Sequence, residues 1–223
     1  CNVTVPYKND VIPYLAQIDE LAAKMGSVNT LVRVDGGYKG YNTDMTGLYR
    51  AMSSDGVSIQ GEQVIVLGAG GVGRAVAFMC AAKGAAHVWL LNRTVEKAAE
   101  VAKEVNLAEG RSCVETLAMS DYDKLPDEKY LVIQSTSVGL YPHVEDAVIT
   151  NPAFYHKVKA GYDLIYRPWE TRFMQLVKEQ GAPAYNGLKM LLYQGIEAFE
   201  LWNQCKIEDE SAYKLYEMLR TTV

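Results

Sequence analysis

The sequence predicts an α/β protein whose larger part is a doubly wound parallel sheet. Residues 63–67 form an unbroken apolar run, which is typical of a parallel strand buried on both faces. After this run, strand-like and helix-like segments alternate along the chain, and this alternation indicates a doubly wound sheet. The expected strands are residues 63–67, 88–91, 130–134 and 162–165, and the expected helices are residues 74–83, 95–105 and 171–179.

The first 60 residues predict a smaller α/β domain. Residues 2–5 alternate as a short strand, and residues 10–24 carry apolar side chains at helical spacing. Residues 28–34 and 38–42 are expected to form a hairpin, because a Gly-Gly pair joins them.

Further helices follow each domain. Thr43 or Asp44 can cap a helix that ends before a linker at residues 53–61, which is marked by serines and glycines. An amphipathic helix is expected to begin at residue 187, and a last helix is expected over residues 209–219.

The composition excludes several classes of protein. The chain has 22 basic and 27 acidic side chains, and its net charge of −5 argues against a nucleic-acid-binding surface. With 49% apolar residues the chain can fill a core, which excludes intrinsic disorder. Glycines and charged side chains interrupt the most apolar stretch, residues 64–91, so no membrane span is expected.

Cysteine and histidine spacing gives no sign of a disulfide framework or a metal site. The four cysteines lie far apart in the sequence without a Cys-x-x-Cys pair, and the three histidines lack the spacing of metal ligands. We therefore expect reduced thiols, a cytoplasmic protein and no bound metal.

A glycine-rich turn follows the first buried strand directly. Gly68-Ala69-Gly70-Gly71-Val72-Gly73 lies between the strand at residues 63–67 and the helix expected from residue 74. There the first glycine permits a tight turn, the second lets a pyrophosphate approach the backbone, and the third lets the helix pack on the strand. The phosphate then meets free N–H groups and the positive end of the helix dipole. A plain glycine-rich connection is the alternative, but this context predicts dinucleotide binding.

The end of the next strand indicates which dinucleotide binds. NAD-specific sites usually place an Asp or Glu there to accept hydrogen bonds from the ribose 2′-OH. This sequence instead has Asn92-Arg93-Thr94, with Lys97 one helical turn beyond Arg93. Both cations could be ordinary helix-surface charges, but positive charge at a helix N-terminus opposes the dipole. An arginine that binds a 2′-phosphate explains the pattern better, and we predict NADP(H) as the cofactor.

Lys8 and Asp44 are candidates for proton transfer. Lys8 follows a short strand and Asp44 precedes a helix, so both are expected near strand ends, where ligands bind in open α/β sheets. Hydride transfer between an alcohol carbon and nicotinamide needs a group that gives or takes the proton on the oxygen. A lysine positioned by a carboxylate can do this. By spacing alone, however, a lone lysine and a lone aspartate are more often surface charges.

Several motifs taken together are more specific than any one of them. They are Asn2-Val3-Thr4-Val5-Pro6-Tyr7-Lys8, Val28-Asn29-Thr30, Asn42-Thr43-Asp44-Met45-Thr46-Gly47, residues 68–75, Asn92-Arg93-Thr94, Ser135-Thr136-Ser137-Val138-Gly139, Asp163-Leu164-Ile165-Tyr166-Arg167-Pro168 and Gly187-Leu188-Lys189-Met190-Leu191-Leu192-Tyr193-Gln194. In this order they closely resemble the motifs of the shikimate dehydrogenase family. The resemblance covers essentially the whole chain, and several motifs are specific to that family.

The resemblance implies a two-domain enzyme that reversibly reduces 3-dehydroshikimate to shikimate with NADPH, in the chorismate route to aromatic amino acids. It implies an N-terminally incomplete substrate-binding domain at residues 1–60 and an NADP-binding Rossmann domain at residues 61–186. Helices at residues 187–223 would then return to the substrate domain. A small-molecule substrate, no nucleic-acid or membrane partner, and a monomer or homodimer are expected.

Roles for single residues follow from the same resemblance. Lys8 and Asp44 correspond to the catalytic pair of the family. The positions that contact substrate, mostly through its ring hydroxyls, correspond to Thr4, Asn29, Tyr166 and Gln194. The cofactor-binding positions already described are Gly68, Ala69, Gly70, Gly71, Val72, Gly73, Asn92, Arg93, Thr94 and Lys97. Further positions that border the cofactor correspond to Thr136, Ser137, Val138, Leu164 and Gly187. Tyr166 as a packing residue, Thr4 as a strand residue and Gln194 as a helix-surface amide are the alternative interpretations.

The chain departs from the family pattern at its start. Family members begin with a strand and a loop that bears two serines for the substrate carboxylate, and neither precedes Asn2 in this sequence. We therefore expect that an upstream segment is missing and that the strand at residues 2–5 has an unpaired edge. Residues 62–186 are expected to bind NADPH, whereas the chain as given is expected to turn over poorly or not at all.

Three alternatives stay open. Quinate/shikimate dehydrogenases differ from the main interpretation partly in the missing serine loop. A non-catalytic NADP(H)-binding module would keep the nucleotide domain without substrate recognition. Glutamyl-tRNA reductase has a similar Asn-Arg-Thr nucleotide domain, but it needs a nucleophilic cysteine in an upstream domain and has no place for Asn42-Thr43-Asp44.

Overall fold

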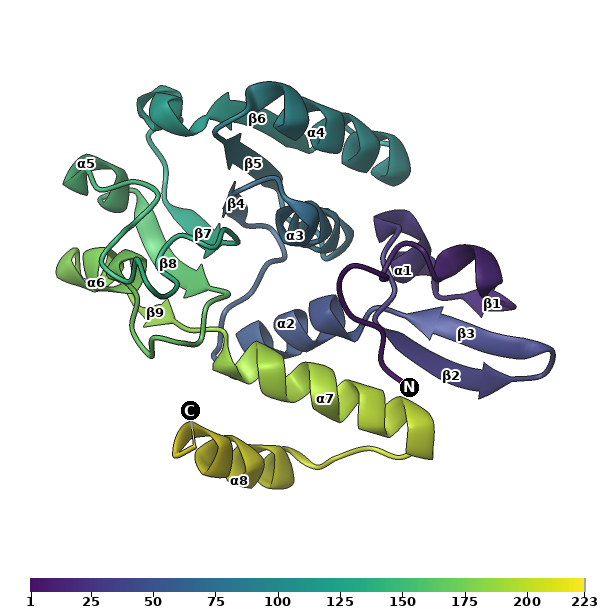
Figure 1. The fold of residues 1–223 in the computed structure, drawn as a ribbon. Helices are drawn as coiled ribbons and strands as arrows, with labels where there is room; N and C mark the ends of the chain where they lie inside the picture. Colours follow the sequence, from purple (N-terminus) through teal and green to yellow (C-terminus); the bar gives the residue numbers. More distant parts are fainter. Residues whose placement is uncertain (223) are drawn as a thin grey trace. The chain divides into compact units, whose positions relative to one another are not determined.

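The computed structural model describes residues 1–222 (Figure 1). The chain divides into two compact units. The central unit is Val57–Leu188, and the terminal unit joins Cys1–Gly56 to Lys189–Val223. Segments from both ends of the sequence therefore fold together in the terminal unit.

The central unit is built on a parallel sheet of six strands. The strands are β4 (Gln63–Leu67), β5 (His87–Asn92), β6 (Val114–Ala118), β7 (Tyr130–Gln134), β8 (Val158–Asp163) and β9 (Ala184–Tyr185), in the order β6-β5-β4-β7-β8-β9. The helices are α3 (Gly71–Ala82), α4 (Val95–Glu109), α5 (Pro152–Tyr155) and α6 (Arg172–Glu179). Helices α3 and α4 lie on one face of the sheet, and α5 and α6 lie on the other (Figure 1). The predicted doubly wound parallel sheet is confirmed.

Strand β4 lies in the interior of this sheet. Each residue from Val64 to Leu67 is fully buried, as the unbroken apolar run predicts. Ile65 and Leu67 pack in one cluster with Phe154 and Phe173, which come from α5 and α6. The helices on both faces therefore exclude water from this strand.

The strand order creates a switch point at the carboxyl end of β4. The chain passes from β4 to β5 and β6 on one side, and then crosses to β7 on the other side of β4. The loops after β4 and β7 therefore lead to opposite faces of the sheet. In open α/β sheets, ligands bind at such a point.

Three strands of the central unit differ from the prediction. The prediction for 162–165 is wrong in position, because β8 is Val158–Asp163, where Lys159, which is exposed, and Gly161 interrupt the apolar residues. Strands β6 and β9 were not expected. Strand β6 lies at the sheet edge with only Val114 buried, and β9 has two half-buried residues, so neither carries a clear apolar pattern.

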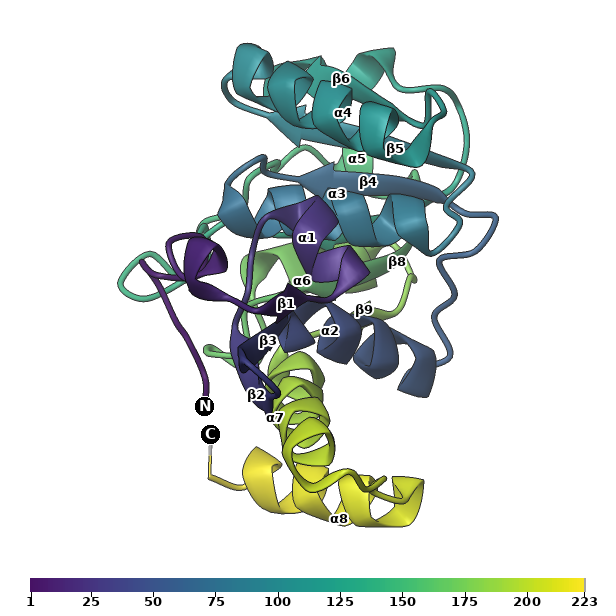
Figure 2. The ribbon, with the colours of Figure 1, turned by 90° about the vertical axis from the view of Figure 1, so that its right-hand side faces the viewer.

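The terminal unit contains a three-stranded sheet and four helices. The strands are β1 (Gln17–Ile18), β2 (Thr30–Val34) and β3 (Gly37–Tyr41), in the order β1-β3-β2. The helices are α1 (Glu20–Met25), α2 (Thr43–Ser54), α7 (Leu188–Asn203) and α8 (Asp209–Arg220), and Figure 2 shows α8 alongside α7. Strands β2 and β3 form the predicted antiparallel hairpin, with Thr30 opposite Tyr41 and Val34 opposite Gly37.

The predicted strand at residues 2–5 is wrong. Only Asn2 forms a bridge, which is antiparallel to Thr30, and residues 5–11 form turns. The carbonyl of Thr4 accepts a hydrogen bond from the N–H of Tyr7 at 2.9 Å, so the chain turns where the strand was expected to continue. Pro6 cannot donate to a strand ladder, which favours this turn.

The predicted helix at residues 10–24 is also wrong over most of its length. The segment contains a 3-10 turn at Ile12–Tyr14, strand β1, and then the short helix α1. Pro13 lacks the N–H that a continuous helix needs. Asp19 starts α1 instead, because its carboxylate accepts hydrogen bonds from the N–H groups of Leu21 and Ala22. These two local effects override the helical spacing of the apolar residues.

Glu200 on α7 connects three segments of the terminal unit. Its carboxylate is buried and accepts hydrogen bonds from Arg50 of α2 at 3.0 Å, from Lys206 at 2.7 Å and from the N–H of Ile207 at 2.9 Å. Burial alone would raise the pKa of Glu200, but these hydrogen bonds outweigh it and hold the pKa below its usual range. The carboxylate therefore stabilises the folded state when it is ionised.

Replacement of Glu200 tests this contribution. Glu200→Gln should lower the free energy of unfolding by about 2 kcal/mol at pH 7, because Arg50 loses its buried anionic partner. The folded-state pKa is depressed, so the contribution should be lost as the pH falls below about 4. Urea denaturation of the parent chain and the variant, at pH 7 and at a pH below about 4, measures this difference in the free energy of unfolding. Glu210→Gln is the control, because Glu210 and Lys214 form an exposed pair on α8, and an equal loss in both variants would contradict the prediction.

Candidate active site

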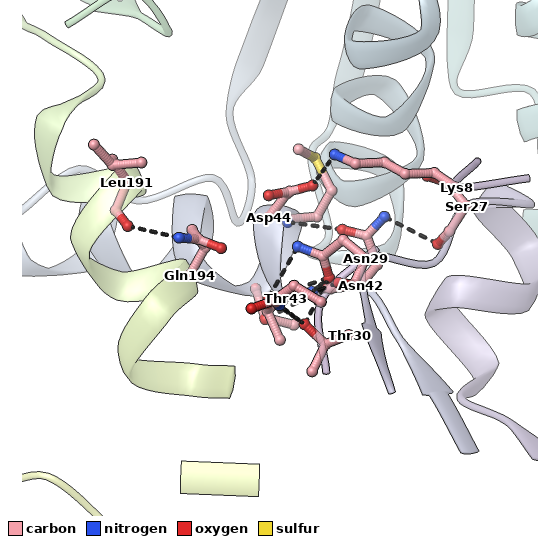
Figure 3. Close-up of polar contacts among 12 residues, drawn as sticks. Lys8, Ser27, Asn29, Thr30, Asn42, Thr43, Asp44, Leu191 and Gln194 are labelled. Atoms are coloured by element: carbon pink, nitrogen blue, oxygen red, sulfur yellow. Dashed lines mark hydrogen bonds and ion pairs between the residues drawn. The ribbon is translucent and has the colours of Figure 1, made fainter. Parts of the chain in front are cut away.

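Lys8 and Asp44, which lie 36 residues apart in the sequence, form an ion pair in the terminal unit. The Lys8 Nζ lies 2.7 Å from the Asp44 Oδ2, and each side chain is about one-quarter exposed, at 26% and 21% (Figure 3). The Lys8 carbonyl accepts a hydrogen bond from the N–H of Val28 at 2.8 Å, which holds the loop that carries the lysine. The ammonium group is thus fixed by a carboxylate and still open to solvent.

Asp44 lies in the first turn of α2, and Asn42 caps that turn. The Asn42 Oδ1 accepts a hydrogen bond from the N–H of Met45 at 3.2 Å, and its Nδ2 donates to the carbonyl of Ser27 at 3.0 Å (Figure 3). The prediction of Thr43 or Asp44 as the cap is therefore wrong by one or two positions. Because the cap falls at Asn42, the Asp44 carboxylate is free to hold Lys8, and the helix dipole favours its negative charge.

A buried cluster of polar side chains from β2 and the residue before it fixes the start of α2. Asn29 is only 4% exposed, and its Oδ1 accepts hydrogen bonds from the N–H of Thr43 at 2.7 Å and from the hydroxyl of Thr30 at 3.0 Å. The Asn29 Nδ2 donates to the hydroxyl of Thr43 at 3.0 Å (Figure 3). Asn29 therefore positions Thr43, the residue before Asp44.

Gln194 is brought close to Asp44 by a glycine. Gly47 lies one turn beyond Asp44 on α2, so the two residues share a face of the helix. A Cβ built on Gly47 would lie 2.8 Å from the Cα of Gln194, which means that α7 packs directly on the backbone of α2 there. The Gln194 Nε2 donates to the carbonyl of Leu191 at 3.0 Å (Figure 3). Thr4 differs: it is exposed, and its side chain makes no hydrogen bond to another described residue.

The glycine loop of the central unit is closed on one side and open on the other. Gly68 has a φ of +102°, and a Cβ on Gly73 would overlap the carbonyl of Gly68, so α3 starts against the end of β4. A Cβ on Gly70 or Gly71, in contrast, would meet no atom within 4 Å. Gly70 is the N-cap of α3 and supplies no side-chain cap, so no capping side chain satisfies the first N–H groups of the helix.

Asn92 joins this loop to the next strand. Its Oδ1 accepts a hydrogen bond from the N–H of Ala69 at 3.1 Å, and its Nδ2 donates to the carbonyl of Thr94 at 2.8 Å. Thr94 is the N-cap residue of α4. Arg93 and Lys97 are exposed beside it, and neither forms an ion pair within residues 1–222. Two unpaired cations therefore stand at the start of α4.

A cavity of about 900 Å³ lies beside Arg93 at the carboxyl edge of the sheet. Its walls come from the ends of β5, β6 and β7 and from the segment at residues 145–151. Lining residues include Asn92, Arg93, Ser120, Thr136, Val138 and Ile149. The lining combines polar side chains with apolar ones such as Val138 and Ile149, as is usual for a small-molecule site.

The remaining predicted positions follow β7 and β8. The hydroxyl of Thr136 accepts a hydrogen bond from the N–H of Val138 at 3.2 Å, within the loop that contains Ser137. The N–H of Leu164 donates to the carbonyl of Gln134 at 3.0 Å. A Cβ on Gly187 would overlap the backbone of Leu164, so these two segments are in contact. Tyr166 is partly exposed beyond the end of β8.

Several residues that shape the site had no predicted role. The Ser135 hydroxyl donates to the carbonyl of Leu67 at 2.7 Å and so ties the β7 loop to the glycine loop. Asp163 and Gln134 are fully buried at the ends of β8 and β7. Each is the last residue of its strand, and a polar residue at a strand end looks the same in the sequence whether it is buried or exposed, so no sequence signal indicated them.

No three His, Cys, Asp or Glu side chains within residues 1–222 come together in a way that could hold a metal ion. Within the same residues, no helix has the length and apolar character needed to cross a membrane.

The parallel sheet, its switch point and the open glycine loop define a dinucleotide-binding protein of the Rossmann type. Comparison with known proteins is more specific. Residues 51–151 match the model for "Shikimate / quinate 5-dehydrogenase", residues 1–31 match "Shikimate dehydrogenase substrate binding domain", and residues 187–213 match "Shikimate 5'-dehydrogenase C-terminal domain".

Single relatives agree with these matches. Shikimate dehydrogenase (NADP(+)) of Moorella thermoacetica is 40% identical over 90% of this chain and 68% of its own length. The structure of a chorismate mutase/shikimate 5-dehydrogenase fusion protein from Clostridium acetobutylicum is 32% identical, with a TM-score of 0.89 over 100% of this chain and 77% of that one. The Listeria monocytogenes shikimate 5-dehydrogenase, in complex with shikimate and NAD, is 28% identical, with a TM-score of 0.87 over 96% of this chain and 76% of that one. The chain belongs to the shikimate dehydrogenase family, and the predicted membership is confirmed.

The contact at Gly47 gives a test of the site's framework. Gly47→Ala should destabilise the chain by about 1–3 kcal/mol, because the new Cβ must push α7 away from α2. The matched control is Gly195→Ala on α7, where a Cβ would meet nothing within 4 Å. Alanine has a higher helix propensity than glycine, so Gly195→Ala should stabilise the chain by up to about 1 kcal/mol. Thermal denaturation of both variants measures the opposite signs, and stabilisation by Gly47→Ala would contradict the close packing.

Proposed function

We propose that this chain catalyses the reversible reduction of 3-dehydroshikimate to shikimate with NADPH. The observation that carries the proposal is the Lys8–Asp44 ion pair at 2.7 Å, in a chain that belongs to the shikimate dehydrogenase family. Such a pair offers a proton donor held in one place and open to solvent, which reduction of a ketone requires.

The residues of the central unit fit NADP(H). The open side of Gly70 and Gly71 and the uncapped start of α3 would hold the pyrophosphate. Arg93 and Lys97 are unpaired cations suited to a 2′-phosphate. The Thr136–Val138 loop lines the cavity beside Arg93 and would border the adenosine half, whereas Leu164 and Gly187 would border the nicotinamide half. When bound, NADPH supplies a hydride to the carbonyl carbon.

Lys8 has the central role among the chain's own groups. Its Nζ would donate a proton to the oxygen as that oxygen gains negative charge, and it would take the proton back in the reverse direction. Asp44 would hold the ammonium group in line and accept a hydrogen bond from a ring hydroxyl. The proton then returns to Lys8 from solvent, because the pair is about one-quarter exposed.

The substrate is a polyhydroxylated ring, and neutral polar side chains suit its recognition. We assign Thr4, Asn29, Gln194 and Tyr166 to the ring hydroxyls. A site that pairs each hydroxyl rejects analogues that lack one, because a polar group is then left without a partner. Asn29 would act with the part of its amide that Thr43 and Thr30 leave free.

Cofactor choice can be tested at Arg93. The chain should bind NADPH much more tightly than NADH, and Arg93→Ala should narrow this gap roughly tenfold or more, because a charge-assisted hydrogen bond contributes about 1.5–3 kcal/mol. Fluorescence titration with both cofactors measures it. Lys103→Ala, an exposed lysine on the same helix, is the control. Equal affinity for NADPH and NADH in the parent chain would defeat the assignment.

The catalytic role of Lys8 has its own test. Lys8→Ala should lower kcat by roughly 100-fold or more and leave the Kd for NADPH unchanged, because the lysine acts in the transition state. Shikimate-dependent reduction of NADP+ measures it, with quinate as the competing substrate. Lys24→Ala is the control, since Lys24 pairs with Glu20 on α1.

A Lys8→Ala variant with normal kcat would contradict the proposed role of Lys8 in proton transfer. A parent chain that binds NADPH without turning over shikimate or quinate would contradict the proposed function for this chain, and both the expected poor turnover and the non-catalytic binding module predict that result.

A further inference from the structure

Two polar side chains are fully buried where β7 and β8 end. Gln134 closes β7 and Asp163 closes β8, and both have no solvent exposure. Burial of a carboxylate is unfavourable unless its oxygens accept hydrogen bonds. The contacts of these two side chains therefore indicate why they are there.

The carboxylate of Asp163 holds the loop that follows its own strand. Its Oδ1 accepts a hydrogen bond from the N–H of Ile165 at 2.9 Å, and its Oδ2 accepts one from the hydroxyl of Thr171 at 2.6 Å. Thr171 in turn caps α6, because its Oγ accepts a hydrogen bond from the N–H of Met174. Both ends of the segment at residues 164–171 are thus fixed to one carboxylate.

Gln134 does the same for the loop after β7. Its Oε1 accepts a hydrogen bond from the N–H of Thr136 at 2.5 Å, and its Nε2 donates to the carbonyl of Val138 at 3.1 Å. The Nε2 also lies 3.5 Å from the Oδ1 of Asp163. The amide of Gln134 therefore shapes the loop at residues 135–139, and the Asp163 carboxylate contacts this amide only at the longer distance.

A third segment is attached through Ile165. The carbonyl of Ile165 accepts a hydrogen bond from the N–H of Gly187 at 2.9 Å. Because Gly187 packs against the backbone of Leu164 without room for a Cβ, its position depends on where the Asp163 loop lies.

We propose that Asp163 is a positioning residue for the nicotinamide half of the cofactor. Through its own hydrogen bonds and through Ile165, it fixes the two segments that carry Leu164 and Gly187. This inference rests on the proposed function, which places the nicotinamide half beside these segments. Asp163 touches neither cofactor nor substrate in this role.

The state of the carboxylate agrees with such a role. Burial raises the pKa of Asp163 to about 6, and its hydrogen bonds with Thr171, Ile165 and Gln134 oppose that rise. At neutral pH the group is therefore mostly ionised, although an apolar residue would avoid the desolvation cost. An ionised carboxylate accepts from all three donors at once, which a neutral or apolar side chain of the same size cannot do.

The test measures how Asp163→Asn changes the Kd for the whole cofactor and the Kd for its adenosine half. The probes are NADPH and adenosine 2′,5′-bisphosphate, which carries the 2′-phosphate and lacks the nicotinamide half. The Kd for NADPH should rise roughly tenfold, since a misplacement of about 1 Å in a positioned group can cost as much as 100-fold. The Kd for the bisphosphate should change much less, because the loop beside Arg93 is held by Gln134, which Asp163 contacts only at 3.5 Å. Arg93→Ala should instead raise the Kd for both ligands, because both carry the 2′-phosphate.

Thr171 supplies the matched pair of variants. Thr171→Val removes the hydroxyl and should weaken NADPH selectively, whereas Thr171→Ser keeps it and should bind like the parent. If Asp163→Asn does not fold, as judged by thermal denaturation, the Thr171 pair decides. Equal weakening of both probes, or no change in NADPH affinity, would overturn the positioning role while leaving the proposed function intact. A parent chain that binds neither probe would overturn both.

Discussion

Side-chain oxygens satisfy backbone N–H groups at six points where the chain enters or leaves a functional loop or helix, and both sites depend on this. The hydrogen-bond ladder of a strand stops at its end, so the next N–H groups need other partners. The pairs are Asn29 with Thr43, Asn42 with Met45, Asn92 with Ala69, Gln134 with Thr136, Asp163 with Ile165 and Asn186 with Leu188. Each pair fixes a segment that carries a proposed ligand contact. The geometry of the sites is therefore determined by groups that need never touch a ligand.

The charges of the two units differ in how they are balanced. In the terminal unit Lys8 already has its carboxylate, and Asp44 lies at the N-terminal end of α2, where the helix dipole favours it. In the central unit Arg93 and Lys97 stand at the start of α4 without an ion pair among residues 1–222, where the dipole opposes them. An arriving phosphate relieves that repulsion. The Lys8–Asp44 pair is thus balanced without a ligand, whereas Arg93 and Lys97 would gain most from an anionic one.

Where local pattern and burial coincide, the sequence predicted the structure well. Strand β4, strand β7 and the β2–β3 hairpin are of this kind, because unbroken apolar runs or a Gly-Gly turn specify them. At residues 10–24 the helical spacing was misleading, because Pro13 and the cap at Asp19 act on single hydrogen bonds that apolar periodicity does not reveal. The family resemblance brought Lys8 and Asp44 together as an expected pair. The role of Asp163 was not visible, since an aspartate at a strand end looks the same whether it is buried or exposed.

The glycines of the site separate into those that the fold needs and those that only a ligand would need. Gly47, Gly73 and Gly187 each face a neighbouring backbone that a Cβ would strike, so packing within the chain explains them. Gly70 and Gly71 face nothing within 4 Å and have no positive φ, so neither packing nor backbone strain requires a glycine there. Within the helix, at Gly71, glycine even lowers stability relative to other residues, whereas at the N-cap position of Gly70 it costs little. The bare backbone at these two positions is therefore best explained by a group outside the chain that must approach it, and the start of α3 is suited to an anionic one.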